Sequence, residues 1–313
     1  MKLGRAKVIS FINLKGGVGK TTAAVNMAAT IAYLGQRQAE ENQRSVRVLL
    51  IDLDPQSNAS LTLLRPEQYD PNQTIVNLFQ HELKRNDTEK SFDLTTIRRE
   101  KPIPDLNLDL IPSGLDLFDI QDELVKYHRY YLSATDILFN ALNALREARE
   151  VYTHIIIDCP PSLGLVTLNG LAMSNYYIIP VFLDAYSHWG LGKIINVVDK
   201  LKHCKASCDL ELLGVLYSRI DKNASSENSY WERKFLDWEK ESEHHFRKLH
   251  KHFESIIFDA RIYQRDVIRK AEALHQPLVA YKPKTTSDRD AQKEIVGEFG
   301  KLITESTKRM KVI

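Results

Sequence analysis

A glycine-rich run near the N-terminus is the part of the sequence best suited to chemistry. It lies between an apolar stretch and an alanine-rich one, and consists of Lys15, Gly16, Gly17, Val18, Gly19, Lys20, Thr21 and Thr22. Glycines let a backbone curl until successive N–H groups point at phosphate oxygens, and the start of a following helix adds partial positive charge. Lys20 could then reach the β- and γ-phosphates of a nucleotide, and the Thr21 hydroxyl could coordinate Mg²⁺. The usual G-x-x-x-x-G-K-[ST] spacing is altered, because Leu14 stands where the first glycine would fall.

Three aspartates follow two other apolar runs. Asp52 and Asp54 come directly after residues 46–51, and Asp158 follows residues 155–157. In an open parallel sheet ligands bind beyond the carboxyl ends of the strands, so these acids could hold Mg²⁺, directly or through water, and orient an attacking water. The alternative is that they are ordinary turn residues, which is common for Asp before Pro. Their combination with the glycine-rich run favours the Mg²⁺ site.

Short apolar runs alternate with helical patterns along the chain. Strands are predicted at residues 8–12, 46–51, 107–111, 152–158, 177–182 and 212–217. Helices are predicted at residues 20–34, with Gly35 as the C-terminal cap, and near residues 135–149, 165–173 and 190–203. Strands this apolar, separated by helices, indicate an α/β fold with a mostly parallel twisted sheet and helices on both faces. No stretch resembles a flexible linker, so residues 1–313 are predicted to form a single domain.

Three polar stretches interrupt this alternation, and we interpret them as insertions near residues 36–45, 81–104 and 222–252. The third stretch is charged but carries five large apolar side chains: Trp231, Phe235, Trp238, Phe246 and Leu249. Their spacing predicts a long amphipathic helix with a solvated polar face. A surface helix is the simpler interpretation, and a partner-binding arm is the alternative.

The composition excludes several classes of protein. The 313 residues contain 43 Lys and Arg against 41 Asp and Glu, a net charge of +2, so any surface for nucleic acid must be a local patch. Three cysteines are too few for a disulfide scaffold and suggest a reducing compartment. We find no apolar run of about 18 residues that could span a bilayer and no signal peptide, so we expect a cytoplasmic protein.

Three motifs carry a resemblance to a known family. The segments KGGVGKTT, DLDPQSNAS and IIIDCPPSLGLVTLNGLAMSNYYIIPV resemble those of the ParA/Soj partition ATPases, which belong to the deviant Walker A group that also includes MinD. The similarity extends from about residue 7 to about residue 307, with the three polar insertions outside it. The resemblance implies a P-loop NTPase fold, Mg²⁺ and ATP as cofactors, and hydrolysis of ATP to ADP and phosphate.

The resemblance also implies roles for individual residues. Lys15 matches the family's signature lysine, which reaches the phosphates of the ATP held by the other subunit of a dimer. Lys20 and Thr21 match the loop lysine and the Mg²⁺ ligand. Asp54 matches the switch aspartate that orients water, and with Lys15 and Lys20 it forms the expected catalytic set. Asp158 matches a residue that binds Mg²⁺ through water, and Asp52 is expected in the outer shell of the metal.

The sequence departs from the family pattern after residue 181. The family often has a glutamine and a glutamate there, then a Glu-Gly pair, whereas this chain has Phe182, Leu183 and Asp184, and later Trp189 before Gly190. Contacts to adenine are expected near Arg219 and Asp221, at the end of the predicted strand 212–217.

A basic stretch follows residue 260. It contains six basic residues: Arg261, Arg265, Arg269, Lys270, Lys282 and Lys284. Two acidic residues, Asp266 and Glu272, partly offset their charge. The segment ARIYQRDVIRKAEALHQPLVAYKPKT is similar to the ParA stretch that makes non-specific DNA contacts. A basic face of this kind binds phosphates and not bases, so binding would be independent of sequence and sensitive to salt. On charge alone, a solvated helix face is the alternative.

The resemblance therefore implies a partition or positioning ATPase associated with the nucleoid. We expect Mg²⁺–ATP to drive formation of a homodimer that binds non-specific DNA, and a cargo-bound, ParB-like partner to stimulate hydrolysis and release. The cargo could be a plasmid, a chromosome or a protein assembly. The alternatives are a MinD-like organiser at a membrane surface and a metabolic enzyme with the same loop. We do not expect membrane docking, because the apolar stripe at residues 295–303 lies well before the end of the chain.

Overall fold

Seven parallel strands form the single sheet of the described chain. The computed structural model describes residues 3–42, 46–85, 90–127, 133–184, 187–205, 208–242 and 253–312. The strand order is β3-β2-β4-β1-β5-β6-β7, and every pairing is parallel. The strands are β1 (Lys7–Phe11), β2 (Val48–Asp52), β3 (Leu108–Ile111), β4 (His154–Asp158), β5 (Tyr176–Val181), β6 (Glu211–Ile220) and β7 (Ile257–Tyr263). The predicted α/β class is therefore confirmed.

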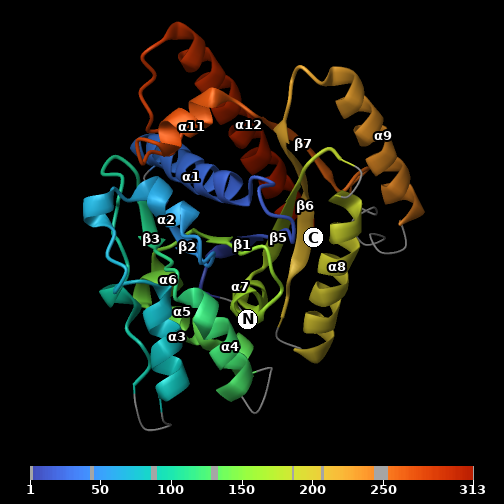
Figure 1. Cartoon of the computed structure of the whole chain (residues 1–313). Helices are drawn as coiled ribbons and strands as arrows, with labels where there is room; N and C mark the ends of the chain where they lie inside the picture. The colour runs from blue at the N-terminus through green and yellow to red at the C-terminus, as the bar shows by residue number, and fades with distance from the viewer. Residues whose placement is uncertain are drawn as a thin grey trace.

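Helices cover both faces of this sheet (Figure 1). One face carries α1 (Lys20–Asn42), α2 (Asn58–Leu63), α11 (Asp266–Glu272) and α12 (Thr286–Met310). The other carries α3 (Ile75–Lys84), α4 (Leu117–Tyr127), α5 (Ile137–Ala144), α6 (Arg146–Glu150), α7 (Leu165–Met173) and α8 (Ser187–Cys204). Short 3-10 turns lie at Pro66–Gln68, Leu94–Thr96 and Ser133–Thr135. Successive side chains of a strand point to opposite faces, so Ile155 and Ile157 enter one apolar core and Ile156 enters the other.

The strand register brings the predicted acids to one edge. Asp52 at the end of β2 lies opposite Asp158 at the end of β4, and Phe11 at the end of β1 lies opposite the same Asp158. The phosphate loop continues from β1. The carboxyl ends of three neighbouring strands therefore meet where the glycine-rich run begins, as expected for a ligand site of an open parallel sheet.

All six predicted strands are present, but a seventh was missed. Strand β7 lies at the edge of the sheet, and two of its seven residues, Asp259 and Arg261, are charged. One side of this strand is only partly covered, so its apolar residues alternate with polar ones and form no continuous run. The basic stretch therefore begins on a strand, and only its residues 266–272 form the short helix α11.

The predicted end of the first helix at Gly35 is wrong. Helix α1 continues to Asn42, through most of the first polar stretch. Gly35 is buried inside the helix, and a Cβ atom at this position would collide with the side chain of Val46, just before β2. The glycine is therefore explained by the close approach of helix and strand and not by a left-handed cap.

The other predicted helices agree more closely with the structure. Residues 165–173 coincide with α7, and residues 190–203 lie within α8. The helix predicted at 135–149 is divided into α5 and α6, because Leu145 has an extended backbone.

The remaining polar stretches lie partly outside the described residues. Residues 81–104 contain the end of α3 and one 3-10 turn, with residues 86–89 not described. The amphipathic helix predicted within 222–252 is present as α9 (Ser225–Glu241), while Phe246 and Leu249 lie outside the described residues. Phe235 of α9 packs edge-on against Tyr217 of β6 at 5.6 Å between ring centroids, so α9 is attached to the sheet through its aromatic face. In the described part of the chain, no helix combines the length and apolarity needed to cross a membrane.

Candidate functional site: a phosphate loop beside α11

The loop between β1 and α1 is held by a side chain that precedes it. Asn13 accepts a hydrogen bond from the Lys15 backbone N–H at 2.9 Å and donates one to the Pro180 carbonyl at 2.7 Å. Gly17 and Gly19 adopt φ angles of 73° and 81°, the left-handed region in which a Cβ atom is strained. These two glycines give the loop the curl that the sequence predicted.

Strand β6 fixes the loop from the other side. Ser218 donates a hydrogen bond to the Val18 carbonyl, and the Arg219 guanidinium donates one to the Gly17 carbonyl at 2.7 Å. Arg219 has a φ of 53°, a strained value for a residue with a side chain. Arg219 was expected to lie near adenine, but the contact described here is with the loop. Ser218 was not predicted, because it lies 200 residues from its partner.

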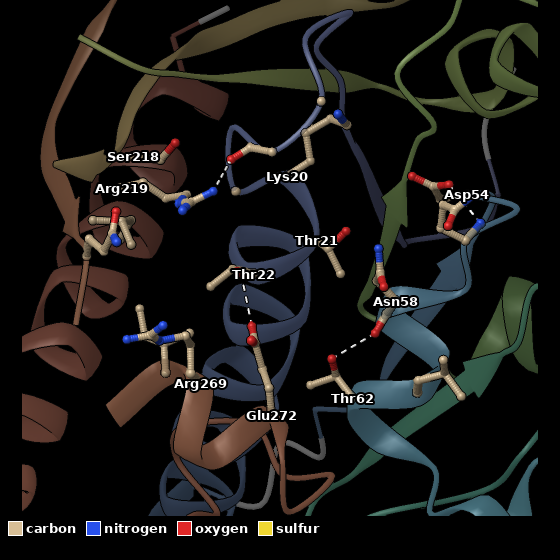
Figure 2. Close-up of a pocket in the computed structure, with 18 of the residues that line it drawn as sticks. Lys20, Thr21, Thr22, Asp54, Asn58, Thr62, Ser218, Arg219, Arg269 and Glu272 are labelled. Atoms are coloured by element: carbon tan, nitrogen blue, oxygen red, sulfur yellow. Dashed lines mark hydrogen bonds between the residues drawn. The ribbon is translucent and has the colours of Figure 1, made fainter. Parts of the chain in front are cut away.

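A cavity of about 650 Å³ opens beside the loop. Figure 2 shows its lining, in which Lys20, Thr21 and Thr22 of α1 face Asp54 and Asn58 on one side and Arg219, Arg269 and Glu272 on the other. The loop glycines Gly16, Gly17 and Gly19 also line it, whereas Val18 is buried. The cationic lining residues are Lys20, Arg219, Arg265 and Arg269, against the carboxyl groups of Asp54 and Glu272. A cavity with this balance is suited to a polyphosphate.

Asp158 is an unpartnered carboxyl group at the end of β4. It is completely buried, and neither of its carboxyl oxygens accepts a hydrogen bond from the described residues. Burial raises its pKa well above the usual range, the nearby Asp52 adds to this, and the Thr21 hydroxyl and the Lys20 ammonium oppose it. A buried carboxyl group is costly to ionise unless a cation neutralises it, and Thr21 and Lys20 are the neighbouring groups that favour its charged form.

The neighbourhood of Asp158 therefore fits the expected Mg²⁺. Among the described residues no cluster of three or more His, Cys, Asp or Glu side chains could hold a metal ion. Mg²⁺ does not need such a cluster, because it is commonly held by one or two carboxylates, waters and the phosphates of a substrate. Thr21, directly, and Asp158, through water, are the protein groups expected to hold it here.

Asp52 is already satisfied by its own turn. Its oxygens accept hydrogen bonds from the Asp54 N–H at 3.0 Å, the Ser60 N–H at 2.8 Å and the Ser60 hydroxyl at 2.7 Å. Burial raises the pKa of Asp52 to about 7 although these hydrogen bonds oppose the shift. Its observed contacts tie β2 to α2, and the role in the outer shell of a metal remains a prediction.

Asp54 lies in the same turn but faces the cavity. One of its oxygens accepts a hydrogen bond from the Gln56 N–H at 3.0 Å. The residue is 7% exposed and lines the cavity beside Asn58, as Figure 2 shows. Of the three predicted aspartates, Asp54 is therefore the one that can approach a group bound next to the loop.

Lys15 points away from this lining. Its ammonium forms an ion pair with the carboxylate of Asp184 and lies 5.1 Å from the ring centroid of Phe182. Lys20 turns inward, where it is buried and donates to the Lys15 carbonyl at 3.2 Å. Phe182 and Asp184 are the residues at which the sequence departs from the family pattern, and their role as neighbours of Lys15 was not predicted.

The six predicted DNA contacts are not equally available. Arg265 is paired with Glu294 at 3.1 Å and Lys270 with Asp288 at 2.7 Å. Arg261 pairs with Glu232, and Arg269 pairs with Asp266 on the surface. Lys282 and Lys284 are exposed between α11 and α12. The structure brings Arg265 and Arg269 to the cavity, and places the other four outside its lining.

Glu272 links the basic helix to the phosphate loop. Its carboxylate accepts a hydrogen bond from the Thr22 hydroxyl at 3.1 Å, as the dashed line in Figure 2 shows. Burial raises the pKa of Glu272, while the Thr22 hydroxyl and Arg219 oppose this shift. In the sequence analysis Glu272 counted only as an acid that lowers the charge of the basic stretch. No motif near Glu272 indicated its hydrogen bond with Thr22, because the two residues are 250 positions apart.

Known proteins resemble the chain in sequence and in fold. A family model described as an AAA domain matches residues 6–211. The sporulation initiation inhibitor protein Soj of Bacillus subtilis is 37% identical over 215 residues, which cover 69% of this chain and 73% of Soj. This identity supports the resemblance drawn from the three motifs.

Solved structures share the fold. The McdA–ATP complex of Cyanothece has a TM-score of 0.66 at 18% identity and covers 99% of this chain and 98% of McdA. Cobyrinic acid a,c-diamide synthase of Mycobacterium smegmatis, with bound ADP and magnesium, has a TM-score of 0.60 at 21% identity and covers 86% of this chain and 92% of the synthase. The first holds ATP, and the second holds ADP and magnesium. The chain belongs to the ParA/Soj-type partition ATPases of the ParA/MinD superfamily.

Proposed function

We propose that this chain is a cytoplasmic, nucleoid-associated ATPase that partitions or positions a cargo on DNA. In this proposal residues 1–313 act as one domain, Mg²⁺–ATP brings two copies together, and the dimer binds DNA without sequence preference. A partner protein on the cargo stimulates hydrolysis, and the dimer then leaves the DNA. The single observation that carries the proposal is the cavity in which the phosphate loop faces Asp54, beside the unpartnered carboxyl group of Asp158.

The loop and its neighbours hold the nucleotide. Backbone N–H groups of residues 16–22 and the start of α1 supply donors to the phosphates, and Lys20 adds a buried positive charge. Mg²⁺ held by Thr21 and Asp158 would neutralise charge on the phosphate oxygens. Arg219, which already contacts the Gly17 carbonyl, lines the cavity from the β6 side.

Asp54 and Lys15 act on the hydrolytic step. Asp54 lies at the cavity wall, where its carboxylate can orient a water toward the terminal phosphate. Lys15 is on the surface and outside the cavity lining, a position from which it serves the nucleotide of a second copy better than its own. Charge on the phosphates would be fully neutralised only in the dimer, so that hydrolysis and subunit pairing depend on each other.

The basic residues of the α11 region would contact DNA. Arg269 is 77% exposed in its side chain, and its partner Asp266 lies on the same short helix. Exposed pairs of this kind contribute little free energy and exchange readily for phosphate contacts. Affinity would therefore fall with rising salt and would not depend on base sequence.

Sizing of the purified protein tests the proposal. We expect a monomer without nucleotide, a dimer with Mg²⁺ and AMPPNP, and a larger complex when a DNA fragment of arbitrary sequence is added. Loss of the DNA complex at high salt would support phosphate contacts. A protein that stays monomeric with AMPPNP would contradict the dimer, and recruitment to vesicles but not to DNA would favour the membrane-surface alternative.

A further inference from the structure

Glu272 is an acidic group in a cavity suited to anions. Its carboxylate lines the cavity together with Lys20, Thr21 and Thr22, and accepts a hydrogen bond from the Thr22 hydroxyl at 3.1 Å. Figure 2 shows it rising from α11 toward the start of α1. Phosphates held at Thr21 and Thr22 would come close to this carboxylate. Like charges a few ångströms apart in a partly buried site repel strongly.

Glu272 is also the last residue of the helix that carries the basic side chains. Helix α11 spans Asp266–Glu272, Arg265 is its N-cap, and Arg269 and Lys270 lie in its last turn. Arg269 lines the nucleotide cavity, while Lys270 is directed to Asp288 of α12. One short helix therefore borders the cavity through Arg269 and Glu272 and carries a further predicted DNA contact, Lys270, outside it.

A second contact attaches the residues just after α11 to helix α2. His275, which has a φ of 55°, lies with its Nδ1 2.5 Å from the Leu61 carbonyl of α2. Helix α2 begins four residues after Asp54 and is tied to Asp52 through Ser60. The segment 272–275 is thus attached to both elements that border the phosphates, the loop through Thr22 and the Asp54 turn through α2.

We propose that Glu272 is a positioning residue that couples the nucleotide to α11. Without nucleotide, the Thr22–Glu272 hydrogen bond holds α11 against the phosphate loop. Phosphates that enter the cavity repel the carboxylate, the hydrogen bond opens, and α11 is released so that Arg269 and Lys270 can turn to DNA. The inference rests on the proposed function in one respect, namely that a polyphosphate occupies this cavity.

Hydrogen exchange of the α11 amides tests the coupling directly. In the wild-type protein we expect Mg²⁺–AMPPNP to accelerate exchange at residues 266–272 several-fold. Glu272→Gln keeps a hydrogen-bond acceptor without the charge, so the nucleotide should leave exchange in α11 unchanged. Glu272→Ala removes the acceptor, so exchange should be fast even without nucleotide. Unchanged or slower exchange in wild-type α11, with AMPPNP binding established by calorimetry, would overturn the proposal.

Two further variants test whether the effect comes from the Thr22–Glu272 hydrogen bond and not from the loss of any acidic side chain. Thr22→Val removes the hydroxyl from the loop side and should reproduce the nucleotide-free behaviour of Glu272→Ala. Glu123→Gln removes an exposed acid on α4, outside the cavity lining, and should behave as wild type. If Thr22→Val leaves α11 exchange unchanged while Glu272→Ala accelerates it, the hydrogen bond is not the coupling and the proposal fails.

DNA binding separates this inference from the proposed function. Without nucleotide, Glu272→Ala should bind DNA more tightly than the wild type does in that state, although dimerisation by AMPPNP still adds affinity, and Glu272→Gln should lose part of the stimulation by AMPPNP. If the wild type binds no DNA in any state while α11 exchange responds as expected, the DNA part of the proposed function fails and the coupling stands. If the nucleotide-free affinity for DNA and its increase with AMPPNP are the same in the wild type and both Glu272 variants, the coupling fails and the proposed function stands.

Discussion

The ammonium of Lys15 pairs with the carboxylate of Asp184 of the same chain, 169 residues later in sequence. Both side chains are partly exposed, at 41% and 31%. A lysine that must reach a second copy has to leave this partner first. Asp184 also accepts a hydrogen bond from Ser187 at 2.9 Å, so the carboxylate is fixed at the start of α8 while the lysine is the movable member.

Asp184→Asn should therefore favour the nucleotide-bound dimer. Exposed ion pairs are worth about 0.2–1 kcal/mol, and each of the two copies gives up one pair, so the concentration needed for dimerisation with Mg²⁺–AMPPNP should fall by a factor of up to about thirty. Analytical ultracentrifugation measures this shift, with Asp184→Glu as the charge-retaining control. A dimerisation constant that is the same in Asp184→Asn and in the wild type would show that the pair does not restrain Lys15.

Lys15→Ala should leave a folded protein that hydrolyses ATP about 100-fold or more slowly. The lysine makes no contact in the core, and a positive charge next to transferred phosphate is typically worth several kcal/mol in the transition state. Phosphate release measures turnover, and thermal unfolding checks the fold. Turnover equal to that of the wild type would contradict the role of Lys15 in the partner's site.

Asp54→Ala should bind ATP but accumulate as the ATP-bound dimer. The substitution removes the carboxylate expected to orient water and should lower turnover by about 100-fold or more. It also frees the Gln56 N–H, a loss of about 1 kcal/mol in the free energy of unfolding. Light scattering with ATP reports the dimer, and a variant that elutes as a monomer with ATP would contradict this expectation.

Arg269→Glu should weaken DNA binding about tenfold and lower the slope of affinity against salt. Its guanidinium is the most exposed of the ion-paired basic groups around α11, and losing a phosphate contact reduces both quantities. Lys308→Glu, an exposed charge reversal on α12, controls for the change in overall charge. Equal losses in the two variants would indicate a diffuse electrostatic effect and no specific surface.

His154 should make the protein less stable in acid. Burial lowers the pKa of His154 to about 4, and the charge of Lys7 acts in the same direction. In the unfolded chain the His154 imidazole takes up a proton near pH 6.5, whereas in the folded protein it stays neutral until about pH 4. The stability that the neutral imidazole allows is therefore fully present above pH 6.5 and is lost as the pH falls from about 6.5 to 4. The loss is on the order of 3 kcal/mol. Thermal unfolding of His154→Gln and wild type should diverge in this window, and parallel curves would refute the assignment.

The fold was largely predictable because its central strands are covered on both faces. Strands β2 and β4 have almost no exposed residues, which leaves continuous apolar runs in the sequence. Edge strand β7 was missed because its buried residues alternate with more exposed ones, among them the charged Arg261. The strand therefore leaves no continuous apolar run in the sequence. Gly35 was misread because a buried glycine in a helix and a glycine cap look alike until the packing of Val46 is known.

The site was predictable only where its chemistry is local. The phosphate loop and the acids Asp54 and Asp158 lie within short motifs, and their strands place them at one edge of the sheet. Asp184, Ser218 and Glu272 contact the loop from 169, 200 and 250 residues away. Contacts between residues so far apart in sequence form only once the whole chain has folded, so no local pattern in the sequence predicts them.

Gly35 has a consequence for the opposite end of its helix. It lies fifteen residues after Lys20, or about 22 Å along the axis at 1.5 Å per residue, and it is the point where α1 touches the approach to β2. A side chain at position 35 would push α1 away from Val46. Because a helix moves as a rigid body, its N-terminal end at Lys20 would then shift as well. The alignment of the phosphate-facing tip is therefore set partly by a missing methyl group two nanometres away, so loss of nucleotide affinity can originate where no ligand is ever touched.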